Sequence, residues 1–470
     1  MLTTLTAPAF AGTWYIEDGN ITVKASGTEG KNMVSQGNKK DVEDTNTIIT
    51  NREDKASSHT VTIETNDKND KVEVTLKDVN IDTSSRDKAA VSVTGEGDTN
   101  IKLDGDNALK SDIYRSGIYG SGSGSLTISG GENDSLTAQG GSGANGISSS
   151  GSLTISGGTV TANGDDGGRG ISSSGSVTIS GGSTVTANGG NGGSLVGGDG
   201  IRSGGGLTVS DGTVTAKGGN GDSKDGYGGD GIRSGGGVTI SGNTVNAAGG
   251  YGGKVGGYGI CSFDRVAISG GTVEAAGGNG STGGGSGIYS SVIDLSGSLE
   301  LTAKAGSPNG KALSQKGSEL VLDTIKDKLG PGAKVTATDA DGKVIDQVST
   351  PRPVEPEESS SSSDGGSATP SAPASSLPGL TVTDKDGQRI SYTSTQSGNT
   401  LTVCVGRFTA SFRISLAALR QLRAEGIETI TFQTILCSTT LSVDELLAMG
   451  GEDAEAVLTH RLTDSSLTVG

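Results

Sequence analysis

The middle of the chain is built from short segments in which apolar and polar residues alternate. One type reads Leu-Thr-Ile or a variant of it, at residues 153–155, 177–179, 207–209, 238–240 and 266–268. A second type reads Thr-Val-Thr-Ala or a variant, at residues 159–162, 184–187, 213–216, 244–247 and 272–275. A period of two places successive side chains on opposite faces of a strand, so each segment predicts a short strand with one buried face.

A Gly-Ile dipeptide precedes each pair of segments and sets the length of the repeat. It begins at residues 117, 146, 170, 200, 231, 259 and 287, so successive spacings are 29, 24, 30, 31, 28 and 28 residues. Three short strands joined by glycine corners in 24 to 31 residues predict one coil of a right-handed parallel β-helix, which is a solenoid. The isoleucines, Leu153 with its equivalents and Val160 with its equivalents then form three interior ladders. The fold class is therefore predicted to be all-β, with each coil stabilised by its neighbours.

Composition excludes several other classes of protein. The chain has 470 residues and 83 glycines without a Gly-X-Y period, which excludes collagen. A propeller has longer repeats and usually more aromatic residues than the 5 Phe and 1 Trp of this chain. The net charge of −17 argues against a nucleic-acid partner. No run of 18 apolar residues occurs, so no transmembrane helix is expected.

Cysteine and histidine are too sparse for several kinds of site. Three cysteines do not make a disulfide scaffold; Cys404 and Cys437 lie in one segment and could pair, while Cys261 stands alone. The two histidines, His59 and His460, are far apart in the sequence. This distance argues against a His-based catalytic triad and against a metal held by histidines.

Changes in composition divide the chain into five parts. Residues 1–11 resemble the truncated remnant of a signal peptide, because residues 9–11 fit the small-x-small rule of a cleavage site. Residues 12–68 are expected to form an N-terminal cap with the first irregular strands, and residues 69–349 the β-helix. Residues 350–378 are rich in Pro, Ser and Glu and read as a flexible linker.

The last part, residues 379–470, is predicted to be a small α+β module. Residues 416–424 predict a short amphipathic helix, with Ser415 as its N-cap and Gly426 as its stop. Residues 443–447 predict a second short helix, and residues 427–436 a strand.

The Gly-rich loops after the third strand of each coil carry the candidate chemistry. They are expected to stack on one side of the solenoid. Carboxylates and loop carbonyls are the hard oxygen ligands that Ca²⁺ needs, so the loops predict a possible calcium site. Its candidate ligands are Asp199, Asp222, Asp225 and Asp230, with Asp165 and Asp166 on an earlier loop.

The same side of the solenoid carries candidate sugar-binding residues. Tyr227, Tyr251 and Tyr258 offer rings that can lie against sugar faces. Arg202 and Arg233 recur one coil apart and could pair with uronate carboxylates. The alternative is that each arginine pairs with an aspartate of its own or a neighbouring coil.

At three motifs the chain resembles the carbohydrate-binding-domain family of pectate-lyase-like β-helix surface proteins from Gram-positive anaerobes. The motifs are residues 74–81, residues 101–107, and the repeated Ser-Leu-Thr-Ile-Ser-Gly-Gly with Asp-Gly-Ile-Arg. The resemblance covers roughly residues 12 to 300. It implies a surface protein that binds plant or host polysaccharide, in some members with calcium, and it carries over no site residue.

The expected function is therefore a secreted or cell-surface, adhesin-like carbohydrate-binding protein without enzymatic activity. Its expected partner is an acidic polysaccharide bound along the loop side, with the cell wall as a further possibility. Two alternatives stay open: a structural stalk that presents the C-terminal module, and a degenerate polysaccharide lyase.

Overall fold

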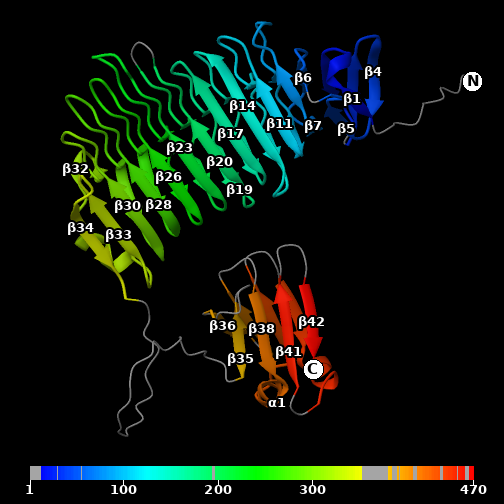
Figure 1. Ribbon diagram of the computed structural model, residues 1–470, viewed down its shortest axis with the longest axis vertical. Coiled ribbons are helices and arrows are strands. Elements are labelled where there is room, and N and C mark those ends of the chain that lie inside the picture. The colour runs from blue at the N-terminus through cyan, green and yellow to red at the C-terminus, as the bar shows by residue number, and fades with distance from the viewer. Residues whose placement is uncertain are drawn as a thin grey trace, which may run out of the picture. The chain divides into compact units, whose positions relative to one another are not determined.

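The computed structural model describes residues 12–351, apart from 29, 54 and 193–195, and residues 379–469, apart from 384–388, 391, 398, 406–409, 435–437, 452–453 and 461–464. The chain divides into two compact units, Met1–Glu357 and Glu358–Gly470, and each is described by itself (Figure 1). The expected signal-peptide remnant lies outside the described residues, as does nearly all of the expected linker.

The first unit is a parallel β-solenoid of about 12 turns, which confirms the predicted fold class. Each regular coil contributes one strand to each of three ladders. The first ladder contains β2 (Ile21–Ala25), β6 (Val61–Glu64), β9 (Val91–Thr94), β12 (Ile118–Gly120), β15 (Ile147–Ser149), β18 (Ile171–Ser173), β21 (Ile201–Ser203), β24 (Ile232–Ser234), β27 (Ile260–Ile268), β29 (Ile288–Leu295) and β31 (Leu313–Gln315).

The long strands β27 and β29 continue into the second ladder. The other members of this ladder are β1 (Thr13–Tyr15), β5 (Thr47–Thr50), β7 (Lys71–Lys77), β10 (Asp98–Asp104), β13 (Leu126–Ser129), β16 (Leu153–Ser156), β19 (Val177–Ser180), β22 (Leu207–Val209) and β25 (Val238–Ile240).

The third ladder forms a separate sheet, whose strands lie side by side along the solenoid in Figure 1. It contains β8 (Asn80–Asp82), β11 (Asp106–Lys110), β14 (Ser135–Ser142), β17 (Thr159–Asp165), β20 (Thr184–Asn188), β23 (Thr213–Lys217), β26 (Thr244–Ala248), β28 (Gly271–Ala276), β30 (Leu299–Lys304) and β33 (Lys334–Thr338).

Strand register confirms the three predicted interior ladders. Ile147 aligns with Ile171, which in turn aligns with the isoleucines of the next three coils. The equivalents of Leu153 and Val160 align in the same way. All of these side chains are buried, so a core built of aliphatic residues fills the interior of the coils.

Both ends of the solenoid depart from the regular coil. Within residues 12–68, the expected cap, parallel coil strands already occur, and β3 (Asn32–Gln36) with β4 (Lys39–Asp44) adds antiparallel strands beside β2. At the other end β32 (Ser318–Glu319) and β34 (Val344–Ser349) pair antiparallel with their neighbours. The 3-10 helix η2 (Leu322–Lys328) lies between these two strands in the sequence.

The Gly-rich loops are stacked as regularly as the strands. Two rows of glycines run along the solenoid, here called the glycine rows. The first row contains Gly190, Gly219, Gly250, Gly278 and Gly306, and the second contains Gly168, Gly198, Gly229, Gly257 and Gly285. Backbone hydrogen bonds of 2.8 to 3.0 Å connect the two rows alternately. After Gly168, the amide of each member donates to the carbonyl of the member of the other row that precedes it in the sequence.

The glycine rows leave no room for a side chain. A Cβ atom at Gly229 would lie 2.0 Å from the carbonyl oxygen of Gly198, and one at Gly257 would lie 1.9 Å from that of Gly229. Such distances are far below van der Waals contact. The loops therefore need glycine because neighbouring backbones pack against each other, and they form an ordered layer.

The second unit contains two four-stranded sheets and two helices in its described residues. One sheet has β35 (Leu380–Thr383), β38 (Ala410–Ser415), β41 (Glu455–His460) and β42 (Ser465–Val469), and the other has β36 (Thr393–Ser397), β37 (Thr400–Cys404), β39 (Thr429–Gln433) and β40 (Ser438–Ser442). The rings of Phe412 and Phe432 pack in the core with centroids 4.8 Å apart.

The two predicted helices of this unit are confirmed. Helix α1 (Leu416–Ala424) begins at Ser415, whose hydroxyl accepts the amide hydrogen of Ala418, and Gly426 follows its end with a positive φ. Helix α2 (Val443–Ala448) follows Ser442. Neither helix is long and apolar enough to cross a membrane, nor is any other in the described part of the chain. The pairing of Cys404 with Cys437 cannot be followed, because residue 437 lies outside the described residues.

Candidate functional site

One position of the repeat, directly before Gly-Ile, links neighbouring coils through its side chain. The carboxylate of Asp199 accepts the backbone N–H of Asp230 at 3.0 Å, and that of Asp230 accepts the N–H of Tyr258 at 2.7 Å. Two coils before Asp199, the amide oxygen of Asn145 accepts the N–H of Arg169 at 2.8 Å. An oxygen acceptor at this position therefore satisfies a backbone donor of the next coil.

A second row of side chains lies beside the first, on the outward face of the strands that follow Gly-Ile. Arg202 of β21 is in register with Arg233 of β24, and the row continues through Cys261 to Tyr289 of β29. The two guanidinium groups therefore come from adjacent coils, whose parallel strands lie about 4.8 Å apart.

Each of these arginines pairs with the aspartate of its own coil, which is one of the two arrangements left open by the sequence. Arg233 lies 3.0 Å from Asp230, and Arg202 lies 3.7 Å from Asp199, between guanidinium nitrogen and carboxylate oxygen. Arg169 lies 3.4 Å from Asp199. The three arginine side chains remain 33% to 44% exposed, so donors remain for a ligand.

These residues line a groove of about 560 Å³, here called the arginine groove. Its charged wall is formed by the arginines and aspartates just described, together with Tyr258. Its other wall comes from the Gly-rich loops, where Val196, Tyr227 and Val255 are in register on successive coils. Members of the glycine rows lie between them, so both walls are held by ordered backbone.

Charge and burial set the electrostatics of the groove. Among its described lining residues, three guanidinium groups face two carboxylates. Burial, with the neighbouring charge of Asp199, raises the pKa of Asp230 to about 7, although the Tyr258 amide and Arg233 oppose the shift. Burial also raises the pKa of the Cys261 thiol to about 12. The thiol is therefore neutral at physiological pH.

Two further aromatic rings contact residues that line the groove. Tyr258 and Tyr289 stack with centroids 5.0 Å apart and planes inclined by 22°. The guanidinium of Arg233 lies 5.2 Å from the ring centroid of Phe263, which is itself 55% exposed. Rings of this kind can pack against the C–H face of a ligand.

The structure brings six of the nine predicted site residues to this groove. They are Asp199, Arg202, Tyr227, Asp230, Arg233 and Tyr258. Tyr251 is exposed and does not line it, because it occupies the row of Asn220, whose side chain accepts the Tyr251 amide hydrogen at 2.9 Å.

The other two predicted calcium ligands, Asp222 and Asp225, are exposed on the loop before Tyr227 and also lie outside the groove lining. Across the described residues, no three His, Cys, Asp or Glu side chains are grouped so that they could hold a metal ion.

The repeat carries a signal for the residues that the sequence analysis missed. Arg169 directly precedes Gly170-Ile171, so it shares the position of Asp199 and Asp230. Tyr289 follows Ile288 and shares the position of Arg202 and Arg233. Aligning the coils on Gly-Ile places Arg169 in the groove and Tyr289 beside it, against Tyr258, whereas the loops alone indicate neither.

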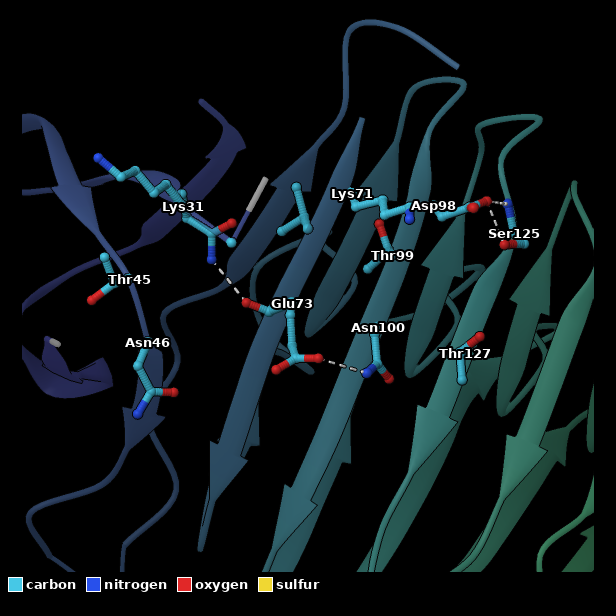
Figure 2. A pocket seen from close by; sticks show the side chains of 13 residues that line it. Lys31, Thr45, Asn46, Lys71, Glu73, Asp98, Thr99, Asn100, Ser125 and Thr127 are labelled. Carbon is cyan, nitrogen blue, oxygen red and sulfur yellow. Dashed lines mark hydrogen bonds between the residues drawn. The ribbon is translucent and has the colours of Figure 1, made fainter. Parts of the chain in front are cut away.

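A second groove, of about 430 Å³, lies near the N-terminal end of the solenoid. Figure 2 shows Thr45 and Asn46 on one side of it and Glu73 and Asn100 on the other. The carboxylate of Glu73 accepts a hydrogen bond from Asn100 and pairs with Lys102 at 2.8 Å. Its charges are largely matched within the protein, so the arginine groove is the stronger candidate.

Comparison of the chain with protein-family models, with curated proteins and with solved structures finds no match in any of the three.

Proposed function

We propose that this chain is an adhesin-like carbohydrate-binding protein, acting outside the cell or at its surface, which holds an acidic polysaccharide in the arginine groove without chemically changing it. The observation that carries this proposal is local charge. A chain of net charge −17 repels a polyanion, yet its described groove presents three guanidinium groups against two carboxylates. Salt screens the charges that lie more than about 8 Å from a bound polyanion. The local charge of the groove therefore determines whether the polyanion is attracted there.

The two walls of the groove suit the two faces of an acidic sugar. Arg202 and Arg233 can each donate two parallel hydrogen bonds to a carboxylate or sulfate group. Val196 and Tyr227 on the opposite wall offer apolar surface to the ring carbons. A chain of anionic sugars running along the solenoid would meet the same pair of walls on successive coils.

The carboxylates of the groove have bonds that favour a structural role. Both oxygens of Asp230 are engaged, one by the Tyr258 amide and the other by Arg233. Asp199 likewise bonds the amide of Asp230 and pairs with arginine. General acid–base catalysis needs a carboxyl group within reach of the substrate, so these contacts support binding without catalysis.

The test is titration of the full chain with polygalacturonate, alginate, dextran sulfate and neutral dextran. We expect binding to the anionic polymers alone. The double variant Arg202→Gln/Arg233→Gln should weaken it by a factor of about 10 or more, since a charge-assisted hydrogen bond contributes about 1.5–3 kcal/mol. Arg265→Gln is the matched control, because Arg265 pairs with Asp294 and does not line the groove.

Two results would contradict parts of the proposal. Unchanged binding by the double variant would remove the arginine groove from it. Release of unsaturated uronides, seen by ultraviolet absorbance, would indicate a lyase. A titration in EDTA tests the candidate calcium site, because weaker binding after removal of the ion would support a calcium ion in the loops.

A structural stalk is a second candidate, favoured by the continuous hydrogen bonding of the glycine rows. In that case the second unit carries the adhesive surface. Binding that survives the double variant, and is lost from a chain that ends at residue 351, would favour the stalk.

A further inference from the structure

Three aromatic side chains beside the arginines form an uncharged surface, here called the aromatic shelf: Tyr258, Phe263 and Tyr289. Tyr258 lines the arginine groove, and its ring stacks on that of Tyr289 with centroids 5.0 Å apart. The ring centroid of Phe263 lies 5.2 Å from the guanidinium of Arg233. Cys261 lies between Arg233 and Tyr289 in their row, yet it is fully buried, so neighbouring groups cover it. The shelf is therefore a packed surface in contact with the charged wall.

The arginines and the shelf occupy successive coils of the solenoid. Arg202 and Arg233 lie on β21 and β24, whereas Phe263 and Tyr289 lie on β27 and β29, the next two strands of the ladder. Neighbouring coils are about 4.8 Å apart, and a pyranose residue in an extended polysaccharide advances its chain by a similar distance. A polysaccharide that runs along the solenoid would therefore place its sugars first against arginine and then against aromatic rings.

The charges on the strands of the shelf disfavour a further acidic sugar there. The charged residues of β27 and β29 are Asp264, which is acidic, and Arg265 and Asp294, which pair with each other. A carboxylate placed on the rings would lose water without gaining a partner, which costs free energy. An uncharged sugar would instead pack its C–H face on the rings.

We propose that the aromatic shelf is a subsite for an uncharged sugar, so that the chain recognises a mixed polysaccharide in which uncharged sugars follow acidic ones. This inference rests on the proposed function and names the class of its ligand. The acidic sugars pair with Arg202 and Arg233, and the uncharged sugars lie on Phe263 and Tyr289. Methyl-esterified uronates and N-acetylated amino sugars are both suitable, because both are uncharged and carry an additional methyl group.

The test uses one galacturonan backbone in three forms: unesterified, methyl-esterified at random on about half of its carboxylates, and fully esterified. Titration calorimetry of the full chain at physiological ionic strength measures the dissociation constant of each form. We expect the half-esterified form to bind at least about threefold more tightly than the unesterified one, because it alone offers acidic and uncharged sugars in succession. The fully esterified form should bind most weakly, because it has no carboxylate for the arginines.

The variant Phe263→Ser/Tyr289→Ser tests whether the shelf causes this preference. Serine is compatible with the strand, because Ser148 and Ser172 occupy the row of Tyr289 in earlier coils. The half-esterified polymer also carries less charge, and a chain of net charge −17 repels it less. Physiological salt screens this repulsion, so the variant should bind the half-esterified and unesterified forms equally.

Tyr119→Ser is the matched control for the loss of an exposed ring. Tyr119 occupies the same row on β12, is 44% exposed and does not line the arginine groove. This variant should keep the preference of the natural chain for the half-esterified form.

The outcomes separate this inference from the proposed function. Binding of the unesterified form as tightly as the half-esterified one, or a preference retained by Phe263→Ser/Tyr289→Ser, would overturn the subsite and leave the proposed function standing. Failure of both charged forms to bind, or equally tight binding of the fully esterified form, would overturn both.

Discussion

At Asp230, burial and hydrogen bonding act in opposite directions on one carboxyl group. Removal from water penalises the charged form, while the Tyr258 amide and Arg233 favour it. Burial and the charge of Asp199 prevail, and the pKa rises from 3.8 to about 7. In the unfolded chain the group has its ordinary value near 4, so its ionisation is linked to folding.

This linkage predicts that Asp230 destabilises the fold as the pH rises from about 4 to about 7. In that window the unfolded chain releases the proton and the folded chain keeps it. The free energy of unfolding therefore falls with rising pH, by an amount on the order of a few kcal/mol. The amide that replaces the carboxyl group in Asp230→Asn does not titrate in this range. Its melting temperature should match the natural chain near pH 4 and exceed it increasingly up to pH 7, as measured by differential scanning fluorimetry.

The control for this prediction is Glu300→Gln, whose difference from the natural chain should not change over the same range. A constant difference between Asp230→Asn and the natural chain from pH 4 to 7 would show that the carboxyl group is not perturbed.

The sequence correctly placed some of the candidate carboxylates in one groove and misplaced others. Asp199 and Asp230 were identifiable because they recur before Gly-Ile. Asp222 and Asp225 have the same chemistry, but they occupy an exposed part of their loop where no repeat position holds them. Spacing within the repeat, more than residue type, decides which carboxylates meet.

Among the structural elements, the strands and the stacking of the Gly-rich loops were predictable, but the close backbone packing within the loop layer was not. An alternating strand shows which residues are buried, and the registers of Ile147, Leu153 and Val160 with their equivalents agree with that pattern. Glycine has no side chain and gives no such pattern. Only the return of Gly-Gly pairs in each coil hints that the loops pack against one another.

The glycine rows predict a strong penalty for the smallest possible side chain. Gly229→Ala places a Cβ atom 2.0 Å from the Gly198 carbonyl oxygen, so the stacked loops must separate and lose hydrogen bonds. We expect a loss of about 2–4 kcal/mol, since overpacking and broken backbone hydrogen bonds both contribute. Chemical denaturation, followed by circular dichroism, measures it.

Gly237→Ala is the matched control, because the nearest atom to its added Cβ, the Arg265 carbonyl oxygen, lies at an ordinary 3.5 Å. Equal stability of the two variants would mean that the loops are not packed as described.

For the whole molecule, the division into two units predicts two separate unfolding events. Each unit has its own buried core, one built of aliphatic ladders and the other around Phe412 and Phe432. Scanning calorimetry should therefore resolve two transitions. Val214→Ala should lower only the first unit's transition and Phe432→Leu only the second's, each by several degrees, because both remove buried apolar atoms.

A single transition that both substitutions shift together would show that the units unfold as one. Each substitution identifies the transition of its own unit, whichever unit unfolds first.

The glycine rows also determine how a molecule of this kind can change its length over generations. A few residues inserted beside a row glycine would displace it and break its hydrogen bonds, whereas the segment between the two row glycines already varies, from seven positions at Gly250 and Gly257 to ten at Gly219 and Gly229. A complete extra coil restores every ladder and both rows. Duplication of the DNA that encodes one coil therefore lengthens the protein without disturbing its packing, whereas small insertions fit only between the two row glycines of a loop.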